Sequence, residues 1–348
     1  ALGFFGKDPG QKKLELLADN SQNKLEKAVK ILKYIEFKIV DKPSPYIHVI
    51  IQAENKVESL IIRDHSNLKW IKINGKKLTQ QDNNKERKNN KIEKSISKKI
   101  KKLTISQIID IVNEEYNDEF KEILKKGLNK NMKLVEAGIN GKGKGLGFKY
   151  EEINDDKINK IGSIIAHGVD ARMAGVPLPA LASSGSGDQG ITISIAINEM
   201  GKIKDKDEDD IFKATLVAHM VAYFIKLFIG RLSSLCGLFT SAAPGILAGL
   251  LYMDGLTDKI EAGINTMFGD SSGILCDGAK STCTLKAVSA FKLAYRHYRL
   301  VQAGLKFDEN IGIMDVNLVG TLNNLEKLSR PSEESLNKTL VKVIERNG

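Results

Sequence analysis

Three cysteines are the residues of this chain whose type and spacing most clearly point to chemistry. Cys276 and Cys283 stand close together in the segment GILCDGAKSTC, and Cys236 stands well upstream in RLSSLCG. All three lie among glycine, alanine, serine and apolar residues. Thiolates are the ligands that zinc, copper and iron–sulfur centres prefer. We therefore interpret the three cysteines as ligands of one metal centre.

The spacing of the cysteines favours an iron–sulfur cluster over zinc. Zinc sites usually contain C-x2-C pairs or closely spaced histidines, and neither accompanies these cysteines. Three sulfur ligands without a fourth suit a four-iron cluster in which one iron keeps an open position. On one straight helix Cys276 and Cys283 would be about 10.5 Å apart along the axis. We therefore expect Cys276 in a turn near Gly273 and Gly278, with Cys283 on the following helix. Three inert buried cysteines are the alternative, and spacing alone does not decide between the two.

A glycine-rich loop is the second motif with chemical potential. Residues 184–190 read SGSGDQG and contain a G-x-G-x-x-G pattern. A dinucleotide site would need a preceding parallel strand, but Pro177 and Pro179 argue against one. Small residues let the backbone approach a ligand, and a helix beginning there would offer N–H groups to a carboxylate or phosphate. A plain tight turn between helices is the alternative.

Five histidines are scattered along the chain. His65, in RDHSNLKW, lies beside a turn at the end of a predicted strand and is the candidate for an acid–base role. His219, in LVAHMVAYF, fits a satisfied core histidine. No lysine stands in a pyridoxal phosphate motif and no G-x-S-x-G elbow occurs, so enzymes of those two kinds lose support.

Composition indicates a globular protein without nucleic-acid or membrane partners. The 348 residues carry a net charge of +10, but the densest lysine run, residues 76–102, lacks interleaved aromatics and fits a solvated linker. Residues 233–252 hold no charge, yet their small residues and Pro244 favour a buried pair of core helices over a membrane span. An odd number of cysteines and the absence of a signal-peptide pattern argue against a disulfide framework, so we expect a cytoplasmic protein.

The hydrophobic pattern predicts which elements position these motifs. Residues 11–32 fit two short helices with a break at residues 19–21. Alternating apolar residues between Phe37 and Ile73, separated by turn signals, predict a small antiparallel sheet with one solvated face. Helical periodicity runs from Leu103 almost to the C-terminus, opens with a capping box at Thr104 and Gln107, and is broken by a glycine-rich loop at residues 138–147.

The predicted fold class is therefore α+β, with a small antiparallel sheet part followed by a larger all-helical part that carries the cluster. We expect an N-terminal α/β part at residues 1–79. A polar linker or loop rich in lysine and asparagine follows at residues 80–102. The helical cluster-binding domain comprises residues 103–348.

Three separated motifs resemble the signature stretches of the L-cysteine desulfidase family, which is related to the alpha chains of iron–sulfur L-serine dehydratases. They are VDARMAGVPLPALASSGSGDQG (169–190), GRLSSLCG (230–237) and FGDSSGILCDGAKSTC (268–283), and the likeness runs through almost the whole chain. The resemblance implies one 4Fe-4S cluster with an open iron site, held by Cys236, Cys276 and Cys283, and no pyridoxal phosphate.

The resemblance also implies a set of substrate residues. A family triplet, His-Thr-Asn, resembles His65-Ser66-Asn67, so His65 is the candidate catalytic residue and Asn67 a candidate substrate-binding residue. Arg172 is a further candidate for binding the substrate carboxylate. The serine–glycine loop of the family lies at the substrate site, and the corresponding candidates here are Ser184, Gly185, Ser186, Gly187 and Gln189.

The implied reaction is β-elimination from L-cysteine to pyruvate, ammonia and sulfide. The open iron would act as a Lewis acid on the leaving sulfur while a base removes the α-proton. Dehydration of L-serine is the alternative reaction. The expected partner is a small amino-acid substrate, and a homo-oligomer is compatible with the sequence.

Three features depart from the family pattern. Family chains begin with a helical segment carrying Pro-Ala-Leu-Gly-Cys-Thr-Glu-Pro, whose cysteine is the expected base, and this chain starts where that segment ends. The loop reads GDQG where the family usually has GNQG, and residues 80–102 are unusually rich in lysine. A non-catalytic protein that binds a cluster or an amino acid is therefore a second hypothesis. A zinc-stabilised structural protein is a third.

Overall fold

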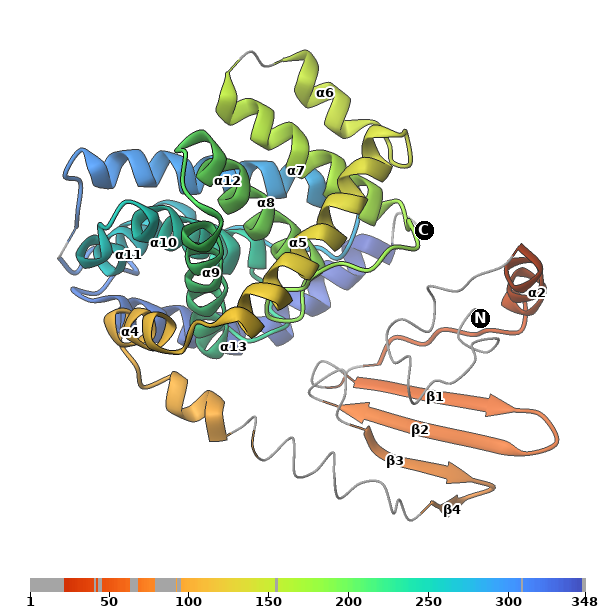
Figure 1. Ribbon diagram of the computed structural model, residues 1–348. Helices are drawn as coiled ribbons and strands as arrows, with labels where there is room; N and C mark the ends of the chain where they lie inside the picture. The colour runs from red at the N-terminus through yellow and green to blue at the C-terminus, as the bar shows by residue number, and fades with distance from the viewer. Residues whose placement is uncertain are drawn as a thin grey trace. The chain divides into compact units, whose positions relative to one another are not determined.

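The chain folds into two compact units. The computed structural model describes residues 22–40, 42, 46–62, 68–78, 92, 95–153, 156–307 and 309–345. One unit comprises Ala1–Ile35 and Leu103–Arg330, and the other comprises Glu36–Lys102 and Pro331–Gly348. A single small sheet accompanied by many helices (Figure 1) confirms the predicted α+β class.

Four antiparallel strands, in the order β1-β2-β3-β4, form the sheet. They are β1 (Tyr46–Gln52), β2 (Lys56–Ile62), β3 (Leu68–Ile73) and β4 (Lys76–Lys77). The β3–β4 hairpin turns through Asn74 and Gly75, whose φ angles of 48° and 80° fit a two-residue type I′ turn. The sheet confirms the prediction made from alternating apolar residues.

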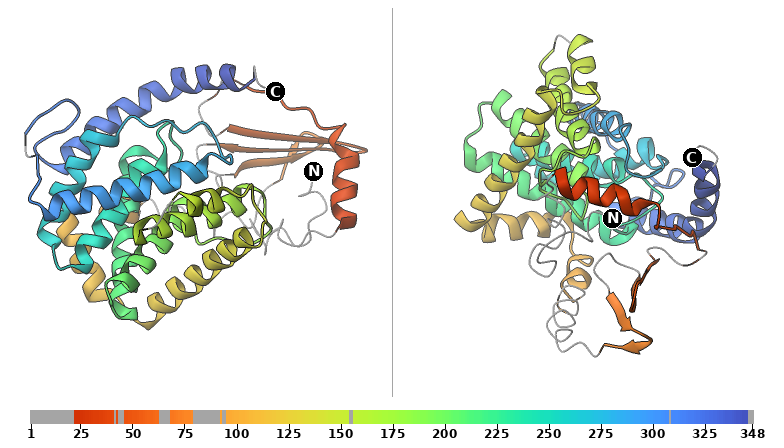
Figure 2. Two further views of the ribbon diagram at one scale, coloured as in Figure 1. Left: turned by 90° about the horizontal axis from the view of Figure 1, so that it is seen from above. Right: turned by 90° about the vertical axis from the view of Figure 1, so that its right-hand side faces the viewer.

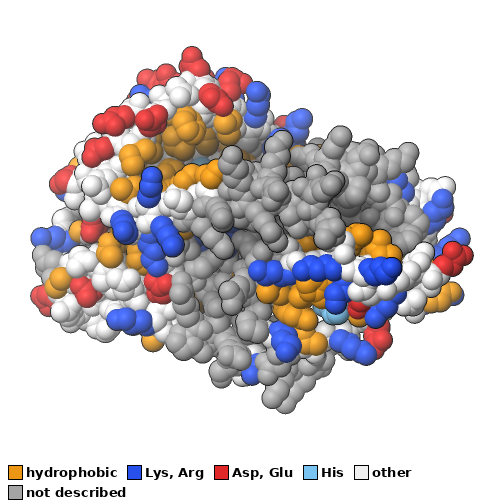
Figure 3. All heavy atoms as spheres, turned by 90° about the horizontal axis from the view of Figure 1, so that it is seen from below, with side chains coloured by type: hydrophobic (Ala, Val, Ile, Leu, Met, Phe, Trp, Pro, Cys, Tyr) orange, Lys and Arg blue, Asp and Glu red, His pale blue; other side chains and the backbone are white. Residues whose placement is uncertain are grey.

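The side chains of β1 are more exposed to solvent than the sequence predicts. Val49, Ile50 and Ile51 of β1 are 44%, 51% and 44% exposed. Because successive strand residues point to opposite faces, both faces of β1 are open in the described part of the chain, rather than one. Hydrophobic side chains lie beside lysines on this surface (Figure 3). Residues 35–40, where Phe37 and Ile39 suggested a strand, are irregular because no strand of the described sheet pairs with them.

The helical elements are, in chain order, α2 (Gln22–Leu32), α4 (Ile105–Glu115), α5 (Asp118–Ile139), α6 (Leu146–Glu152), α7 (Lys157–Met173), α8 (Gly187–Ile203), α9 (Glu208–Ile229), a π-turn (Leu238–Ala242), α10 (Ala243–Met253), a 3₁₀ turn (Thr257–Lys259), α11 (Ile260–Ser271), α12 (Cys283–Gln302) and α13 (Leu318–Glu345). Of the predicted helix pair at residues 11–32, the second is α2, and residues 11–21 lie outside the described residues. The residues of α13 are divided between the two units after Arg330.

The core of the helical unit is built around α8 and α10. Both helices are apolar on nearly all sides, which is the pattern of a fully enclosed helix. Helix α8 contacts α5, α7, α9, α10 and α12, as Figures 1 and 2 also show. A methyl group at Gly245 would lie 2.5 Å from the carbonyl oxygen of Ala218, so glycine in α10 allows α9 to approach closely.

The uncharged stretch at residues 233–252 is buried, as predicted, but it does not form a pair of helices. The π-turn at Leu238–Ala242 runs directly into α10, so a single helical run crosses the core. Pro244 lies just after the π-turn, at the start of α10. Among the described helices, only α9 is long and apolar enough to cross a membrane, and 67% of its apolar window is buried inside the protein.

The start of α4 confirms the predicted capping box. The Thr104 hydroxyl accepts a hydrogen bond from the backbone N–H of Gln107 at 3.2 Å. The Gln107 side chain in turn accepts from the backbone N–H of Thr104 at 2.9 Å. The segment before it differs from the predicted loop, since residues 95–100 are helical; residues 80–91, 93 and 94 lie outside the described residues.

Thr104→Ala should lower the free energy of unfolding by about 1 kcal/mol, because the replacement removes the hydroxyl that caps α4. The measurement is urea unfolding followed by circular dichroism. Thr104→Ser keeps a hydroxyl and should unfold at nearly the wild-type midpoint. Equal midpoints for the alanine and serine variants would show that the capping box contributes nothing.

Candidate functional site

A short antiparallel bridge joins the two cysteine-bearing loops. Leu235 pairs with Leu275. The Cys236 N–H donates to the carbonyl oxygen of Ile274 at 2.7 Å, and the Cys276 N–H donates to that of Ser234 at 2.7 Å. Because side chains alternate across a strand, both cysteines flank the Leu235–Leu275 pair on the same face of the bridge. Two segments far apart in the sequence thus present two thiols together.

Cys283 reaches this bridge from the start of a helix. Cys276 lies in an irregular loop, and Cys283 is the first residue of α12. Gly278 has a φ of 94°, a conformation that favours glycine, and its carbonyl oxygen lies 3.5 Å from the Cys283 Sγ. The predicted placement of Cys283 on the following helix is confirmed, whereas Cys276 lies in an irregular loop rather than in a turn.

The three thiols are free, and Cys276 is close enough to Cys236 and to Cys283 to influence each of them electrostatically. Cys236 is 5% exposed, and Cys276 and Cys283 are half-buried. Burial raises the pKa of the Cys236 and Cys283 thiols, and the neighbouring Cys276 adds to both increases. Such thiols stay protonated in the apo protein unless a metal displaces the proton.

The donor set fits a cluster better than a single ion. Within the described ranges, no group of three or more His, Cys, Asp or Glu residues is close enough to hold one metal ion. A four-iron cluster holds its thiolate ligands farther apart than one ion does. Three sulfur donors gathered from a bridge and a helix start therefore suit a cluster with one position lacking a protein ligand.

The serine–glycine loop forms a tight turn that opens α8. Ser183 and Ser186 exchange backbone hydrogen bonds of 3.0 and 2.9 Å. Ser184 and Gly185 between them have φ angles of 51° and 84°. The residues before the loop form no strand, which agrees with the argument against a dinucleotide site. A serine in the left-handed region is strained, and such strain is often found at functional sites.

Polar atoms without hydrogen-bond partners gather around this loop and the cysteines. The Ser184 Oγ and Gln189 Oε1 atoms are buried and have no hydrogen-bond partner, and the Asp188 Oδ1 has an ion-pair contact but no hydrogen bond. The hydroxyls of Ser234 and Thr284, which lie in the two cysteine-bearing segments, are also unpartnered. An unpaired buried polar atom costs roughly 1–3 kcal/mol, so their concentration at one place points to a bound polar group as the missing partner.

Arg172 and Asp188 connect the loop to the cysteines. A methyl group at Gly187 would lie 2.2 Å from the Arg172 Nε, so the guanidinium lies directly against the start of α8. The same Nε is 3.4 Å from the Asp188 Oδ1. Burial raises the pKa of Asp188 to about 6, although Arg172 opposes the increase. Asp188 also contributes to the raised pKa of the Cys283 thiol, after burial. A methyl group at Gly237, the residue after Cys236, would lie 2.2 Å from the Gln189 Nε2, so the loop and the cysteines belong to one site.

His219 is a site residue that the sequence did not reveal. Its Nδ1 is 3.0 Å from the Ser183 hydroxyl, whereas its Nε2 is buried without a partner. Burial lowers the pKa of His219 to about 4, so the imidazole is neutral at neutral pH. The prediction of a satisfied core histidine is correct for only one ring nitrogen. Only the packing of α9 against the loop places this residue, and no local pattern could have found it.

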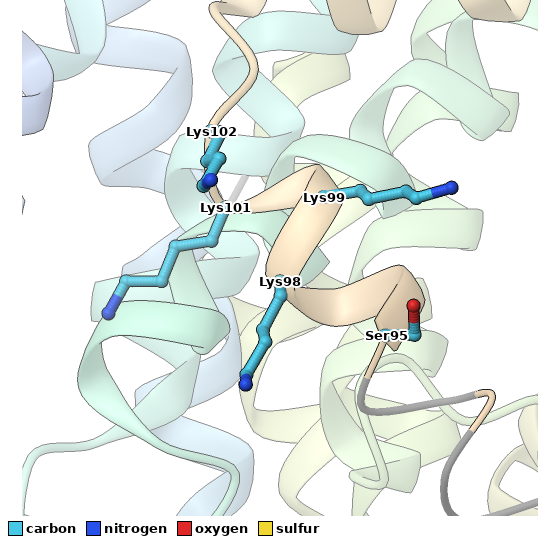
Figure 4. Close-up of a pocket in the computed structure, with 5 residues that line it drawn as sticks. All are labelled: Ser95, Lys98, Lys99, Lys101 and Lys102. Carbon is cyan, nitrogen blue, oxygen red and sulfur yellow. The ribbon is translucent and has the colours of Figure 1, made fainter.

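The remaining predicted residues are only partly placed by the structure. His65 and Asn67 lie outside the described residues, so their predicted roles stay predictions. Gly185, Ser186 and Gly187 shape the loop, and the Ser186 hydroxyl caps α8. The pocket in Figure 4 contains none of the predicted site residues. It is lined by Ser95, Lys98, Lys99, Lys101 and Lys102 of the unit that carries the sheet.

An α+β chain with three free cysteines gathered beside a polar loop is the arrangement expected of an iron–sulfur lyase. The chain belongs to the serine dehydratase alpha chain family, which it matches over residues 12–342. This is a family of lyases that depend on iron–sulfur clusters.

Several curated relatives are similar over most of their length. The UPF0597 protein of Desulfatibacillum aliphaticivorans is 31% identical over 358 residues, covering 99% of this chain and 81% of the relative. A UPF0597 protein of Clostridium perfringens is 30% identical over 345 residues, covering 96% and 79%. That of Lachnoclostridium phytofermentans is 28% identical over 351 residues, covering 99% and 82%. No solved structure matches this chain.

Asp188→Asn should stabilise the apo protein in a pH-dependent way. The folded-state pKa of about 6 is above the ordinary 3.8, so folding favours the protonated carboxyl. The wild type therefore loses stability relative to the variant as the pH rises from about 4 through 6. Above that range we expect a constant advantage for the variant of about 3 kcal/mol.

Urea unfolding at pH 4 and pH 7.5 measures this difference. Asp110→Asn, which changes an exposed aspartate of α4, is the control for loss of a surface charge. A difference between wild type and Asp188→Asn that does not grow with pH would contradict the burial argument.

Proposed function

We propose that this chain catalyses β-elimination of L-cysteine to pyruvate, ammonia and sulfide. The observation that carries the proposal is the Leu235–Leu275 bridge, which gathers Cys236 and Cys276 beside Cys283. The loop with the unpartnered Ser184 Oγ and Gln189 Oε1 atoms adjoins the cysteines, because the Gln189 Nε2 lies directly against Gly237, the residue after Cys236. The choice of L-cysteine rests on the resemblance of the three motifs to the desulfidase family.

Cys236, Cys276 and Cys283 would hold the cluster as thiolates. Metal binding releases the thiol protons, so the raised pKa of the buried thiols does not prevent ligation. When bound, the cluster supplies a Lewis-acidic iron without a protein ligand, to which the sulfur of the substrate is attracted.

The loop and Arg172 would hold the carboxylate of the substrate. The backbone N–H groups at the start of α8 and the guanidinium against Gly187 both favour an anion there. The Ser184 hydroxyl can donate a third hydrogen bond. Asp188 competes for Arg172, so a bound carboxylate has to share or displace that ion pair.

The reaction requires that a base take the α-proton of the substrate. The electron pair of the broken C–H bond forms the Cα–Cβ double bond, and the C–S bond breaks with its electrons leaving on sulfur. The resulting aminoacrylate tautomerises to an imine, which water hydrolyses to pyruvate and ammonia. We propose His65 as an acid–base residue and Asn67 as a substrate contact, on the resemblance of His65-Ser66-Asn67 to the family triplet.

The proposal is tested by anaerobic reconstitution with iron and sulfide, followed by assays of sulfide and pyruvate release from L-cysteine. Wild-type protein should bind iron and acid-labile sulfide and turn over L-cysteine in preference to L-serine. Cys276→Ala should abolish turnover, whereas Ser281→Ala, in the same loop, should retain it. Faster pyruvate release from L-serine would assign the protein as a serine dehydratase instead.

Two other results would overturn the lyase assignment altogether. A bound cluster without release of sulfide or pyruvate from either amino acid would support a non-catalytic binding protein. Stoichiometric zinc in place of iron and sulfide would support a structural zinc site.

Arg172→Met should raise the KM for L-cysteine by about tenfold or more, because a charge-assisted hydrogen bond to the carboxylate contributes roughly 1.5–3 kcal/mol. The value of kcat should change less than KM, since carboxylate binding is equal in the ground and transition states. Steady-state sulfide release measures both constants. Arg299→Met, at an exposed position of α12, is the matched control. An unchanged KM for Arg172→Met would remove this residue from the substrate site.

A further inference from the structure

Lys286 fastens the Cys276 loop to the helix that begins with Cys283. It lies three residues after Cys283 in the first turn of α12, and its side chain is 24% exposed. Its Nζ donates to the carbonyl oxygen of Leu275 at 2.8 Å and to the Oδ1 of Asp277 at 2.8 Å. Leu275 and Asp277 are the residues immediately before and after Cys276, so one ammonium group contacts the chain on both sides of this cysteine.

The contact to Leu275 also reaches the bridge itself. Leu275 is the residue that pairs with Leu235, next to Cys236. Lys286 therefore touches the strand pair that positions Cys236 and Cys276 while it sits on the helix that positions Cys283. It is a direct side-chain link between these cysteine-bearing segments.

Lys280 is a second lysine beside the same loop, and its contacts differ from those of Lys286. It forms an ion pair with Asp277, three residues before it in the chain. Lys280 and Lys286 therefore share Asp277 as their carboxylate partner. Both lysines carry a positive charge. Of the two, only Lys286 has described contacts that join the loop to α12.

We propose that Lys286 is a positioning residue that fixes Cys276 relative to Cys283 and supplies the positive charge that offsets an anionic, thiolate-ligated cluster. The inference rests on the proposed function because it takes the three thiolates as cluster ligands. Removal of a residue that contacts a metal ligand, but not the metal itself, typically lowers metal affinity by about 10–100-fold. The other described contacts between this loop and Cys283 are the Sγ contact with the Gly278 carbonyl oxygen and a backbone hydrogen bond to Lys280.

The test follows iron release from reconstituted protein to a chelator under anaerobic conditions, together with the reduction potential of the cluster. Lys286→Gln should release iron about tenfold faster than wild type and should have a lower reduction potential. Lys286→Arg keeps the charge and a donor, and should restore most of both properties. Lys280→Gln removes the same charge but leaves the Leu275 contact, so its iron release should stay close to that of wild type.

Asp277→Asn weakens the same link from the loop side and should accelerate iron release to an intermediate extent. If Lys286→Gln fails to fold, iron release from Asp277→Asn is measured in its place. Wild-type rates and potential in Lys286→Gln, or equal acceleration in Lys280→Gln, would overturn the positioning role.

The two proposals fail in different ways. Wild-type protein that takes up no iron and sulfide would overturn the proposed function together with this inference. Wild-type protein that retains a cluster, with Lys286→Gln indistinguishable from it, would overturn this inference alone.

Discussion

Two backbone hydrogen bonds hold the candidate site together. They run from the Cys236 N–H to Ile274 and from the Cys276 N–H to Ser234. The Cys236 carbonyl oxygen also accepts from Phe239 and Thr240, at the start of the π-turn. Cys236 is thus fixed on one side to the loop of Cys276 and on the other to the helical run through the core. Without these contacts nothing described would hold the loops of Cys236 and Cys276 side by side.

Apolar packing in the core offsets the free-energy cost of the unpaired polar groups at the site. Helices α8, α9 and α10 pack closely through glycine and alanine, and this apolar packing stabilises the unit. Two of these helices begin beside a site segment: α8 at the serine–glycine loop, and the π-turn before α10 at Cys236. The unpartnered Ser184, Gln189 and Ser234 atoms destabilise the apo protein and favour a bound polar group.

The features that could be predicted from the sequence depend on local rules. The capping box at Thr104, the position of Cys276 outside a helix and the helix start at Cys283 follow from residues within a few positions of one another. The contacts of His219 with Ser183 and of Arg172 with Asp188 could not be predicted, because they join segments that only tertiary packing brings together. The predicted helix pair at residues 233–252 was wrong because a π-turn continues into α10 without a break. The roles of His65 and Asn67 stay predictions.

The central claim is that Cys236, Cys276 and Cys283 together hold one four-iron cluster. The most direct measurement is anomalous X-ray diffraction at the iron absorption edge, from crystals of the anaerobically reconstituted protein. We predict one cluster of iron peaks bonded to these three sulfurs, with one iron that has no protein sulfur ligand. An absence of iron at this site, or a cluster bonded through other residues, would contradict the account.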